Sequence, residues 1–344
     1  MKQISRITKV GLAAFVIAGL LTACSNLSGP GAAKGDGGTV TLYADMDPQE
    51  AQPLIDDFTE KTGIKVELFT GGSAAVLARW ESEEASNVHV ADVVSISGPA
   101  AYDKVDKAGY LAPIPDSVDF LEEDRPSNAF DPERMWFATT ATVVCIAYNP
   151  QNVDESEAPK TWSDLLDSQW KGELTIPAPT LSTATVSYYQ MRNDESLGDP
   201  FLEALSKMEP VRTQKSGDTV SALVTGDTSV GIANDNAVWQ QIKAGAPLTA
   251  VYPSDGQPVL TNYTMFPKGA PNPEGAAQLL NYLASTDAGA LYAETSAYSA
   301  LSSIDPVGDG RPGLDELTAW PYDPAELVAD QPQMVPYLQG LFGE

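Results

Sequence analysis

The chain has 344 residues, of which 43% are hydrophobic and 19% are charged, as in an ordinary soluble globular protein of one or two domains. Its 20 basic residues stand against 47 acidic ones, which gives a formal net charge of −27. This charge argues against a nucleic-acid-binding protein, because no basic surface remains to neutralise phosphates.

The N-terminus has the features of a bacterial lipoprotein signal. A short basic segment precedes the apolar run 10–21, which is too short to span a bilayer comfortably. The sequence Leu-Thr-Ala-Cys then ends at Cys24, which we expect to be lipidated and to become the first residue of the mature chain. A plain secretory signal with an incidental cysteine is the alternative. Residues 24–38 are rich in Gly, Ser and Ala and predict a flexible tether.

The first elements after the tether alternate between strands and helices. Runs of β-forming residues predict strands over 39–43 and 64–69. Apolar residues at helical spacing predict a helix over 48–61, which Gly63 ends. A further helix begins after the glycine-rich turn 70–73. At such a turn, backbone N–H groups at the start of a helix can bind an anion.

The pattern of strand, polar turn and helix recurs along the chain. Strands are predicted at 91–98, 136–148, 174–177 and 230–233, and helices at 100–108, 220–225, 237–244 and 274–286, while the tail 305–344 predicts only short helical patches. The alternation predicts an α/β protein that binds ligands at the carboxyl ends of its strands. Two such blocks, before and after about residue 140, predict two lobes with a cleft between them.

Polar turns at the predicted helix starts supply the candidate ligand-binding residues. Their hydroxyl and N–H groups suit a phosphate or phosphonate, although helix caps that bind nothing have similar sequences. Asp235 can accept from an ammonium group or cap a helix, and Tyr43 can form an aromatic wall. The candidate set is Tyr43, Gly72, Ser73, Ser97, Ser182, Thr183, Ala184, Ser216, Gly217, Asp235 and Asn236.

The cysteines and the single histidine give little support for an enzyme. With Cys24 lipidated, Cys145 has no disulfide partner, and its apolar neighbours predict a buried thiol. His89 is the only imidazole, and neither a hydrolase elbow nor a metal-ligand motif accompanies it. We therefore predict no catalytic residue, no protein-bound metal and no cofactor.

Four motifs follow one another in an order that a known family shares. They are the segment 58–66 (FTEKTGIKV), Ala91-Asp92-Val93, the segment 159–166 (PKTWSDLL), and Trp170-Lys171-Gly172. Together they resemble the extracellular solute-binding proteins of ABC importers, over roughly residues 39–300. Within that family the chain is similar to the branch that holds ferric-iron-, thiamine-, phosphonate- and sugar-phosphate-binding members.

The resemblance implies a periplasmic-binding-protein-like fold of type II, with a ligand cleft between two α/β lobes. We assign 1–23 to the signal peptide, 39–140 and 256–344 to the first lobe, and 141–255 to the second. We expect a non-enzymatic monomer, which the N-terminal signal predicts to be anchored through Cys24 on the extracytoplasmic face of the cell membrane. Such a protein delivers its ligand to the permease subunits of an ABC importer.

The ligand stays open between two chemical classes. Ferric-binding relatives hold the metal with adjacent tyrosines, often with a His and a Glu; here the tyrosine positions fall at about Asn236 and Ala237, and the others near Asp47 and Ser97. The resemblance therefore favours a small anion, either an organophosphate or a phosphonate such as 2-aminoethylphosphonate. Ferric iron is the alternative, and a surface lipoprotein without a transport role is a third possibility.

Overall fold

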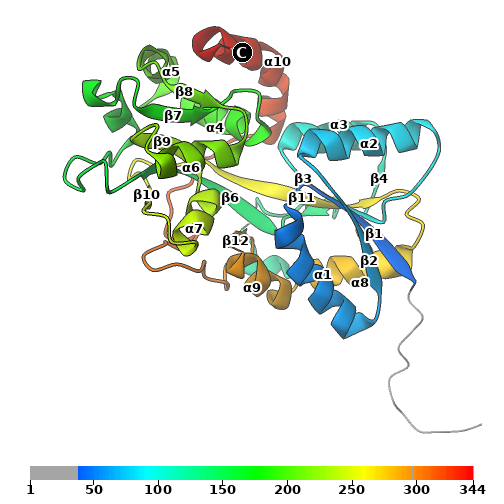
Figure 1. Cartoon of the computed structure of the whole chain (residues 1–344). Helices are drawn as coiled ribbons and strands as arrows, with labels where there is room; N and C mark the ends of the chain where they lie inside the picture. Colours follow the sequence, from blue (N-terminus) through cyan, green and yellow to red (C-terminus); the bar gives the residue numbers. More distant parts are fainter. Residues whose placement is uncertain (1–37, 127, 296, 344) are drawn as a thin grey trace, which may run out of the picture. The chain divides into compact units, whose positions relative to one another are not determined.

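The computed structural model describes residues 38–126, 128–295 and 297–343, which form two α/β lobes (Figure 1). The predictions for Cys24 and for residues 1–37 lie outside this part of the chain. Among the described residues, no helix combines the length and the apolar character needed to cross a membrane.

The first lobe is built from both ends of the sequence. Its elements are β1 (Thr39–Ala44), α1 (Pro48–Thr62), β2 (Lys65–Thr70), α2 (Ser73–Ala85), β3 (Val93–Ser97), α3 (Pro99–Lys107), β4 (Leu111–Ala112), the 3₁₀ turn Glu122–Asp124, β5 (Trp136–Phe137), α8 (Pro273–Ala284), α9 (Thr286–Glu294) and β12 (Tyr298–Ser299). Its core lies on both faces of the parallel strands β2-β1-β3, around Phe58, Trp80 and Phe137.

The second lobe is built from the middle of the sequence. Its elements are the 3₁₀ turns Trp162–Leu166 and Ser168–Trp170, β7 (Leu174–Pro177), α4 (Ser182–Asn193), α5 (Gly198–Lys207), β8 (Val211–Thr213), α6 (Ser216–Thr225), β9 (Val230–Asn234), α7 (Asp235–Lys243) and β10 (Thr249–Val251). Trp162, Tyr188 and Ile146 lie in its largest core cluster.

Two long strands, β6 (Thr140–Tyr148) and β11 (Val259–Pro267), connect the lobes. The second half of β11 pairs with β3, whereas its first half pairs with β6. The second half of β6 then pairs with β9 and leads into the parallel strands β9-β7-β8. The cleft between the lobes therefore lies beside these two crossing strands, in the arrangement that the resemblance implied.

Most of the predicted elements are present close to their expected bounds, and the start of α1 shows why. Asp47 caps this helix by accepting a hydrogen bond from the Gln49 N–H at 2.8 Å, and Glu50 completes a capping box. Gly63 ends it with a φ of 78°, a conformation that a residue with a side chain adopts only at a cost.

The C-terminal region departs from its prediction. Instead of short helical patches, residues Pro324–Phe342 form α10, a helix of 19 residues that contains Pro332 and Pro336. Its apolar side chains, among them Met334 and Leu338, are buried in the core of the second lobe. This burial offsets the cost of the prolines. It places α10 in the core of the second lobe, although the helix also contacts α3 of the first lobe, to which its position in the sequence had assigned it.

A second departure is α9, because the sequence predicts a helix over 274–286 and no further helix over 287–294. The structure ends α8 at Ala284, and Ser285 caps the next helix by accepting from the Ala288 N–H at 3.3 Å. A serine that accepts from the third residue after it acts as an N-cap, so it starts a new helix.

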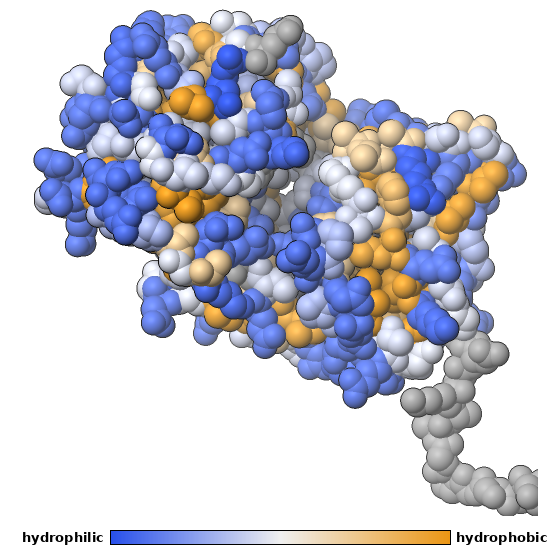
Figure 2. Space-filling model, in the orientation of Figure 1, coloured by the Kyte–Doolittle hydropathy of each residue, from blue (hydrophilic) through white to orange (hydrophobic). Residues whose placement is uncertain are grey.

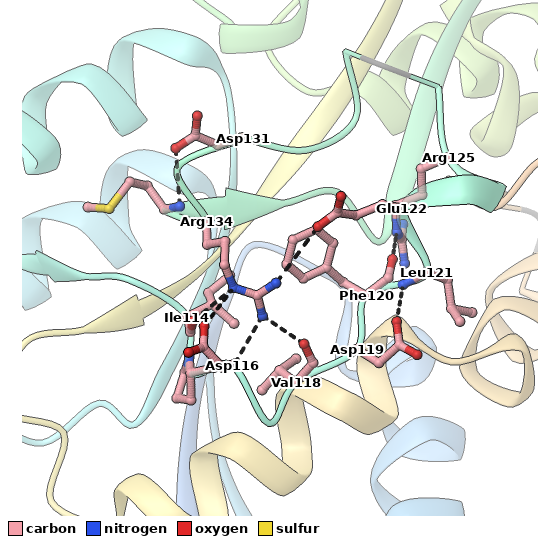
Figure 3. A network of polar contacts seen from close by, with 12 residues as sticks. Ile114, Asp116, Val118, Asp119, Phe120, Leu121, Glu122, Arg125, Asp131 and Arg134 are labelled. Atoms are coloured by element: carbon pink, nitrogen blue, oxygen red, sulfur yellow. Dashed lines mark hydrogen bonds and ion pairs between the residues drawn. The ribbon is translucent and has the colours of Figure 1, made fainter.

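The proline-rich connection after β4 is held to the first lobe by two arginines (Figure 3). Arg134 donates to the carbonyl oxygens of Pro115 and Val118 at 3.0 and 2.7 Å, and its guanidinium lies 4.5 Å from the Phe120 ring centroid. Arg125 is buried and donates to the carbonyl oxygen of Phe120 at 2.5 Å. These contacts satisfy backbone carbonyls that no sheet or helix can pair.

Candidate functional site

The candidate site is the cleft between the lobes, and Figure 2 shows this face of the molecule hollowed there. Two cavities lie in the cleft, and both contain Ser97 in their walls. We call the first the acidic cavity; its volume is about 100 Å³, and its polar walls are Asp45, Glu50, Ser97, Thr140, Thr142, Asn236, Asn262, Tyr292 and Thr295. No lysine, arginine or histidine is among the described residues that line it.

Asp45 is the central group of the acidic cavity. It directly follows β1, and its Oδ2 accepts hydrogen bonds from the Ser73 hydroxyl at 2.5 Å and from the Ser97 N–H at 2.6 Å. Burial raises the pKa of the Asp45 carboxyl, while these hydrogen bonds act against the rise. The carboxylate thus occupies the helix start at which the sequence predicts a bound oxyanion.

Glu50 supplies a second carboxylate and contacts the opposite lobe. Its Oε1 accepts a hydrogen bond from Gln240 Nε2 of α7 at 2.7 Å. Burial raises the pKa of the Glu50 carboxyl, and the nearby charges of Asp47 and Asp45 add to the rise. Gln240 Nε2 also donates to the Thr295 carbonyl oxygen at 3.3 Å, so α7 joins the two lobes at the edge of the acidic cavity.

Further acceptors and hydroxyls complete the acidic cavity. Asn236 Oδ1 is buried and has no hydrogen-bond donor among the described residues. The side chain of Asn262, in contrast, is fully engaged: its Oδ1 accepts from the Thr139 and Thr140 N–H groups, and its Nδ2 donates to Ser95 and Thr139. Asn262 therefore fixes the crossing strands, while Asn236 presents a free acceptor.

We call the second cavity the apolar cavity. It has a volume of about 260 Å³ and lies at the starts of α2 and α3, against α4 and α10. Its walls include Ala74, Leu77, Ala100, Val186 and Leu327. The only charged side chain among its described walls is that of Lys104, which pairs with Glu81 at 2.6 Å.

The structure brings three of the sequence-predicted residues into this cleft. Ser73 lines the apolar cavity, Asn236 lines the acidic one, and Ser97 lines both. Gly72 directly precedes Ser73 as the N-cap residue of α2, and it is exposed with open space around it.

The second and third predicted turns lie at the first residues of α4 and α6. Ser182 and Thr183 begin α4, whose later residues Thr185 and Val186 line the apolar cavity. Ala184 is only 2% exposed and packs in the core of the second lobe, so it has no free surface for a ligand. Ser216 and Gly217 begin α6, four residues earlier than predicted, and Gly217 lines neither of the two cavities.

Tyr43 is not an aromatic wall of the cleft, contrary to its prediction. It has no exposed surface, and its hydroxyl donates to Glu83 of α2 at 2.7 Å. Burial, together with this carboxylate, raises the pKa of Tyr43 to about 12. Its position on a central strand places it in the core, with Phe69 and Arg79 against its ring.

Asp235 is also placed differently from its prediction, because its carboxylate is paired inside the protein. Arg311 donates to one oxygen and the Tyr252 hydroxyl to the other, and both Asp235 and Arg311 have fully buried side chains. Burial raises the pKa of the Asp235 carboxyl, against the charge of Arg311. A ligand has no access to this carboxylate.

Sequence reasoning missed Asp45, Glu50 and the threonines of the crossing strands. Asp45 and Glu50 stand directly after a predicted strand and at the start of a predicted helix, which is the signal that could have identified them. Thr140 and Thr142 belong to a segment whose composition predicts a strand and gives no sign of a binding site. Cys145, on the same strand, is fully buried as predicted.

No group of three or more His, Cys, Asp or Glu side chains in the described part of the chain is arranged to hold a metal ion. His89 lies on a connection outside both cavities, with Nδ1 at 3.1 Å from Glu84. The chemistry offered by the cleft is therefore that of carboxylates, an amide oxygen and hydroxyls.

Comparisons with known proteins identify the class. The iron-bound HitA of Pseudomonas aeruginosa has the same fold, with a TM-score of 0.74 at 20% identity over 87% of this chain and 99% of HitA. The spermidine/putrescine-binding periplasmic protein of Escherichia coli (strain K12) is 25% identical over 301 residues, which are 81% of this chain and 82% of that protein. Iron uptake protein A1 of Synechocystis sp. is 25% identical over 281 residues, 77% and 76% of the two chains.

The fold is that of type II periplasmic binding proteins. Residues 89–311 match the family of bacterial extracellular solute-binding proteins, and the chain belongs to that family. Members are non-enzymatic components of ABC importers that deliver small solutes to a permease from outside the cytoplasm.

Proposed function

We propose that this protein captures a small solute that carries a protonated amine and delivers it to the permease of an ABC importer. The observation that carries the proposal is the position of Asp45. Its carboxylate takes the Ser73 hydroxyl and the Ser97 N–H for itself, so the start of α2 presents a negative group to the cleft.

The other residues that line the acidic cavity also favour an ammonium group over an anion. Glu50 adds a carboxylate and Asn236 adds an acceptor without a donor. An ammonium group has three donors and no acceptor, so it matches such a wall, whereas an anion entering there would face two carboxylates.

The relatives include proteins named for amines and proteins named for iron, so the choice of an amine rests on the walls of the acidic cavity. The spermidine/putrescine-binding protein resembles this chain over most of both lengths, and its named ligands are amines. Iron uptake protein A1 is equally similar, so its name alone keeps iron among the ligands to test. The predicted phosphonate, 2-aminoethylphosphonate, also carries an amine, which the acidic cavity would hold while the helix starts near Ser97 face the phosphonate.

The membrane anchor belongs to the same proposal. Cys24 follows a lipoprotein-like signal, and the tether to residue 38 would let the folded part reach a permease in the same membrane. We propose that the chain acts as a lipid-anchored monomer on the extracytoplasmic face of the membrane. Metabolic labelling with a fatty acid, lost in Cys24→Ala, tests the anchor separately.

A matched set of ligands tests the solute class. Ethylamine, 2-aminoethylphosphonate and ethylphosphonate have the same two-carbon core and differ in their charged ends; putrescine, phosphate and ferric citrate extend the set. A ligand that binds only the folded protein raises its melting temperature, so the readout is a thermal shift confirmed by calorimetry.

We expect the amines to stabilise the protein and ethylphosphonate and phosphate to have no effect. Stabilisation by ethylphosphonate but not by ethylamine would overturn the proposal and favour the oxyanion that the sequence predicts. Stabilisation by ferric citrate alone, with a visible tyrosinate absorption band, would overturn it in favour of iron.

A further inference from the structure

The apolar cavity bears on which amine the protein binds, and this inference rests on the proposed function. The acidic and apolar cavities meet at Ser97, which lines both. Ser73 of the apolar cavity is also hydrogen-bonded to Asp45 of the acidic cavity at 2.5 Å. An ammonium group held by Asp45 therefore has the apolar cavity next to it.

The apolar cavity has space for part of a ligand, but it has no negatively charged side chain that could pair with a cation. Its volume of about 260 Å³ exceeds the volume of about 100 Å³ of the acidic cavity. Alanine, leucine and valine side chains from α2, α3 and α4 dominate its walls, with Leu327 from α10. No carboxylate is among the described residues that line it.

The one charge in these walls disfavours a second ammonium group. Lys104 lines the apolar cavity, and its own charge is matched by Glu81. A diamine that places one ammonium beside Asp45 has to place the other among aliphatic side chains, near this lysine, or against neutral polar groups such as those of Thr185 and Gln331, because no carboxylate is among the described walls. Removing an ammonium from water without a partner is costly, whereas burying methylene groups is favourable.

We infer that the cleft selects amphiphilic monoamines, which carry one protonated amine and an uncharged apolar body, over diamines of the same length. The amine lies in the acidic cavity with Asp45 and Glu50, and the apolar body lies in the apolar cavity. This specificity differs from that of the relative named for spermidine and putrescine.

Calorimetry with three ligands tests the inference: ethylamine, hexylamine and 1,6-diaminohexane. Each buried methylene strengthens binding by about fourfold, so hexylamine, with four more methylenes, binds more tightly than ethylamine by about two orders of magnitude. The diamine has the same chain as hexylamine but a second charge, and we expect it to bind about tenfold or more weakly than hexylamine.

A charge added to the apolar cavity should reverse the preference. Ala74 lines the apolar cavity at the exposed start of α2, where an acidic residue is compatible with the helix. In Ala74→Asp, 1,6-diaminohexane should gain about tenfold relative to hexylamine. Ala75→Asp is the control, because Ala75 is the next exposed residue of the same helix and does not line the apolar cavity.

The outcomes separate this inference from the proposed function. Equal or tighter binding of 1,6-diaminohexane by the unchanged protein overturns the inference and leaves the amine proposal intact. An equal gain in Ala74→Asp and Ala75→Asp also overturns it, because the effect would then be general electrostatics. Binding of ethylphosphonate without binding of any amine overturns both.

Discussion

Asp45 and Asp235 occupy corresponding places in the two lobes but have opposite roles. Each directly follows a strand, β1 or β9, and burial raises the pKa of each carboxyl. Asp235 has a buried guanidinium partner, Arg311, whereas Asp45 is hydrogen-bonded by the neutral residues Ser73 and Ser97 and has no ion pair among the described residues. The charge of Asp235 is therefore satisfied within the protein, and that of Asp45 is available to a ligand.

The comparison shows that position after a strand does not identify a ligand-binding carboxylate. What distinguishes the two residues is a cation from a distant segment, since Arg311 lies 76 positions beyond Asp235. Arg311 also lies 4.2 Å from the Tyr298 ring centroid, which holds it in place. Loss of the partner cation at Asp235 should accordingly lower stability, whereas loss of the charge at Asp45 should lower affinity.

The largest expected effect is that of Arg311→Met on stability. Removing the guanidinium leaves the Asp235 carboxylate buried without its cationic partner, which costs about 3–5 kcal/mol of unfolding free energy. Urea unfolding measures the change. The double variant Asp235→Leu with Arg311→Met is the control and should recover most of the loss; a mild effect of Arg311→Met alone would show that the pair is dispensable.

Asp45→Asn should affect binding instead. The amide keeps the size of the side chain and can still accept from Ser73 and Ser97, but it removes the negative charge from the acidic cavity. Loss of a charged hydrogen bond lowers affinity for hexylamine by about 10- to 100-fold, measured by calorimetry. Unchanged affinity in a folded variant would contradict the role of Asp45.

The stability difference between Asp45→Asn and the unchanged protein should depend on pH. Because the folded-state pKa of Asp45 is raised, the folded protein holds this proton more tightly than the unfolded chain, and ionisation of Asp45 destabilises the fold. Asp45→Asn should therefore be more stable than the unchanged protein at pH 7. The difference should vanish below about pH 4, near the ordinary pKa of aspartate. Urea midpoints at pH 7 and pH 3.5 measure it, and a difference that persists at pH 3.5 would assign it to another cause.

The contrast between the two aspartates also shows how far the sequence predicts this protein. Local patterns identified the strands and helices around the cleft, because their periodicity and caps, such as Asp47 and Gly63, act over a few residues. They failed at α10, where the prolines argue against a helix and only packing on the second lobe explains it. Burial by residues that are distant in the sequence cannot be predicted from a local sequence pattern.

The candidate site was predicted less completely, for the same reason. Ser73, Ser97 and Asn236 were found from turns at helix starts, and they do line the cleft. Their role differs from the prediction, because the Ser73 hydroxyl and the Ser97 N–H, which the sequence predicts as donors to an oxyanion ligand, donate to the Asp45 carboxylate instead. The partner of each group comes from another element, and the spacing of residues does not reveal it.

Gln240→Ala should have a smaller effect, on closure of the lobes. It removes the 2.7 Å hydrogen bond from α7 to Glu50 in the opposite lobe. One hydrogen bond contributes about 0.5–1.5 kcal/mol, so affinity for hexylamine should fall by about two- to tenfold. Gln241→Ala, at an exposed position of the same helix, is the control. Equal affinities of the two variants would show that this contact does not support the closed cleft.

The smallest effect on binding is expected for Tyr43→Phe, which tests whether the tyrosine belongs to the core. The hydroxyl donates to Glu83 and lies outside both cavities, so its removal should cost about 1 kcal/mol of unfolding free energy and leave affinity for hexylamine unchanged. Asp45→Asn, a few ångströms along the same chain, should show the reverse. A loss of affinity in Tyr43→Phe at unchanged stability would contradict this assignment to the core. It would mean that Tyr43 lies in the cleft, as the sequence predicts, and that β1 contacts the ligand in addition to Asp45.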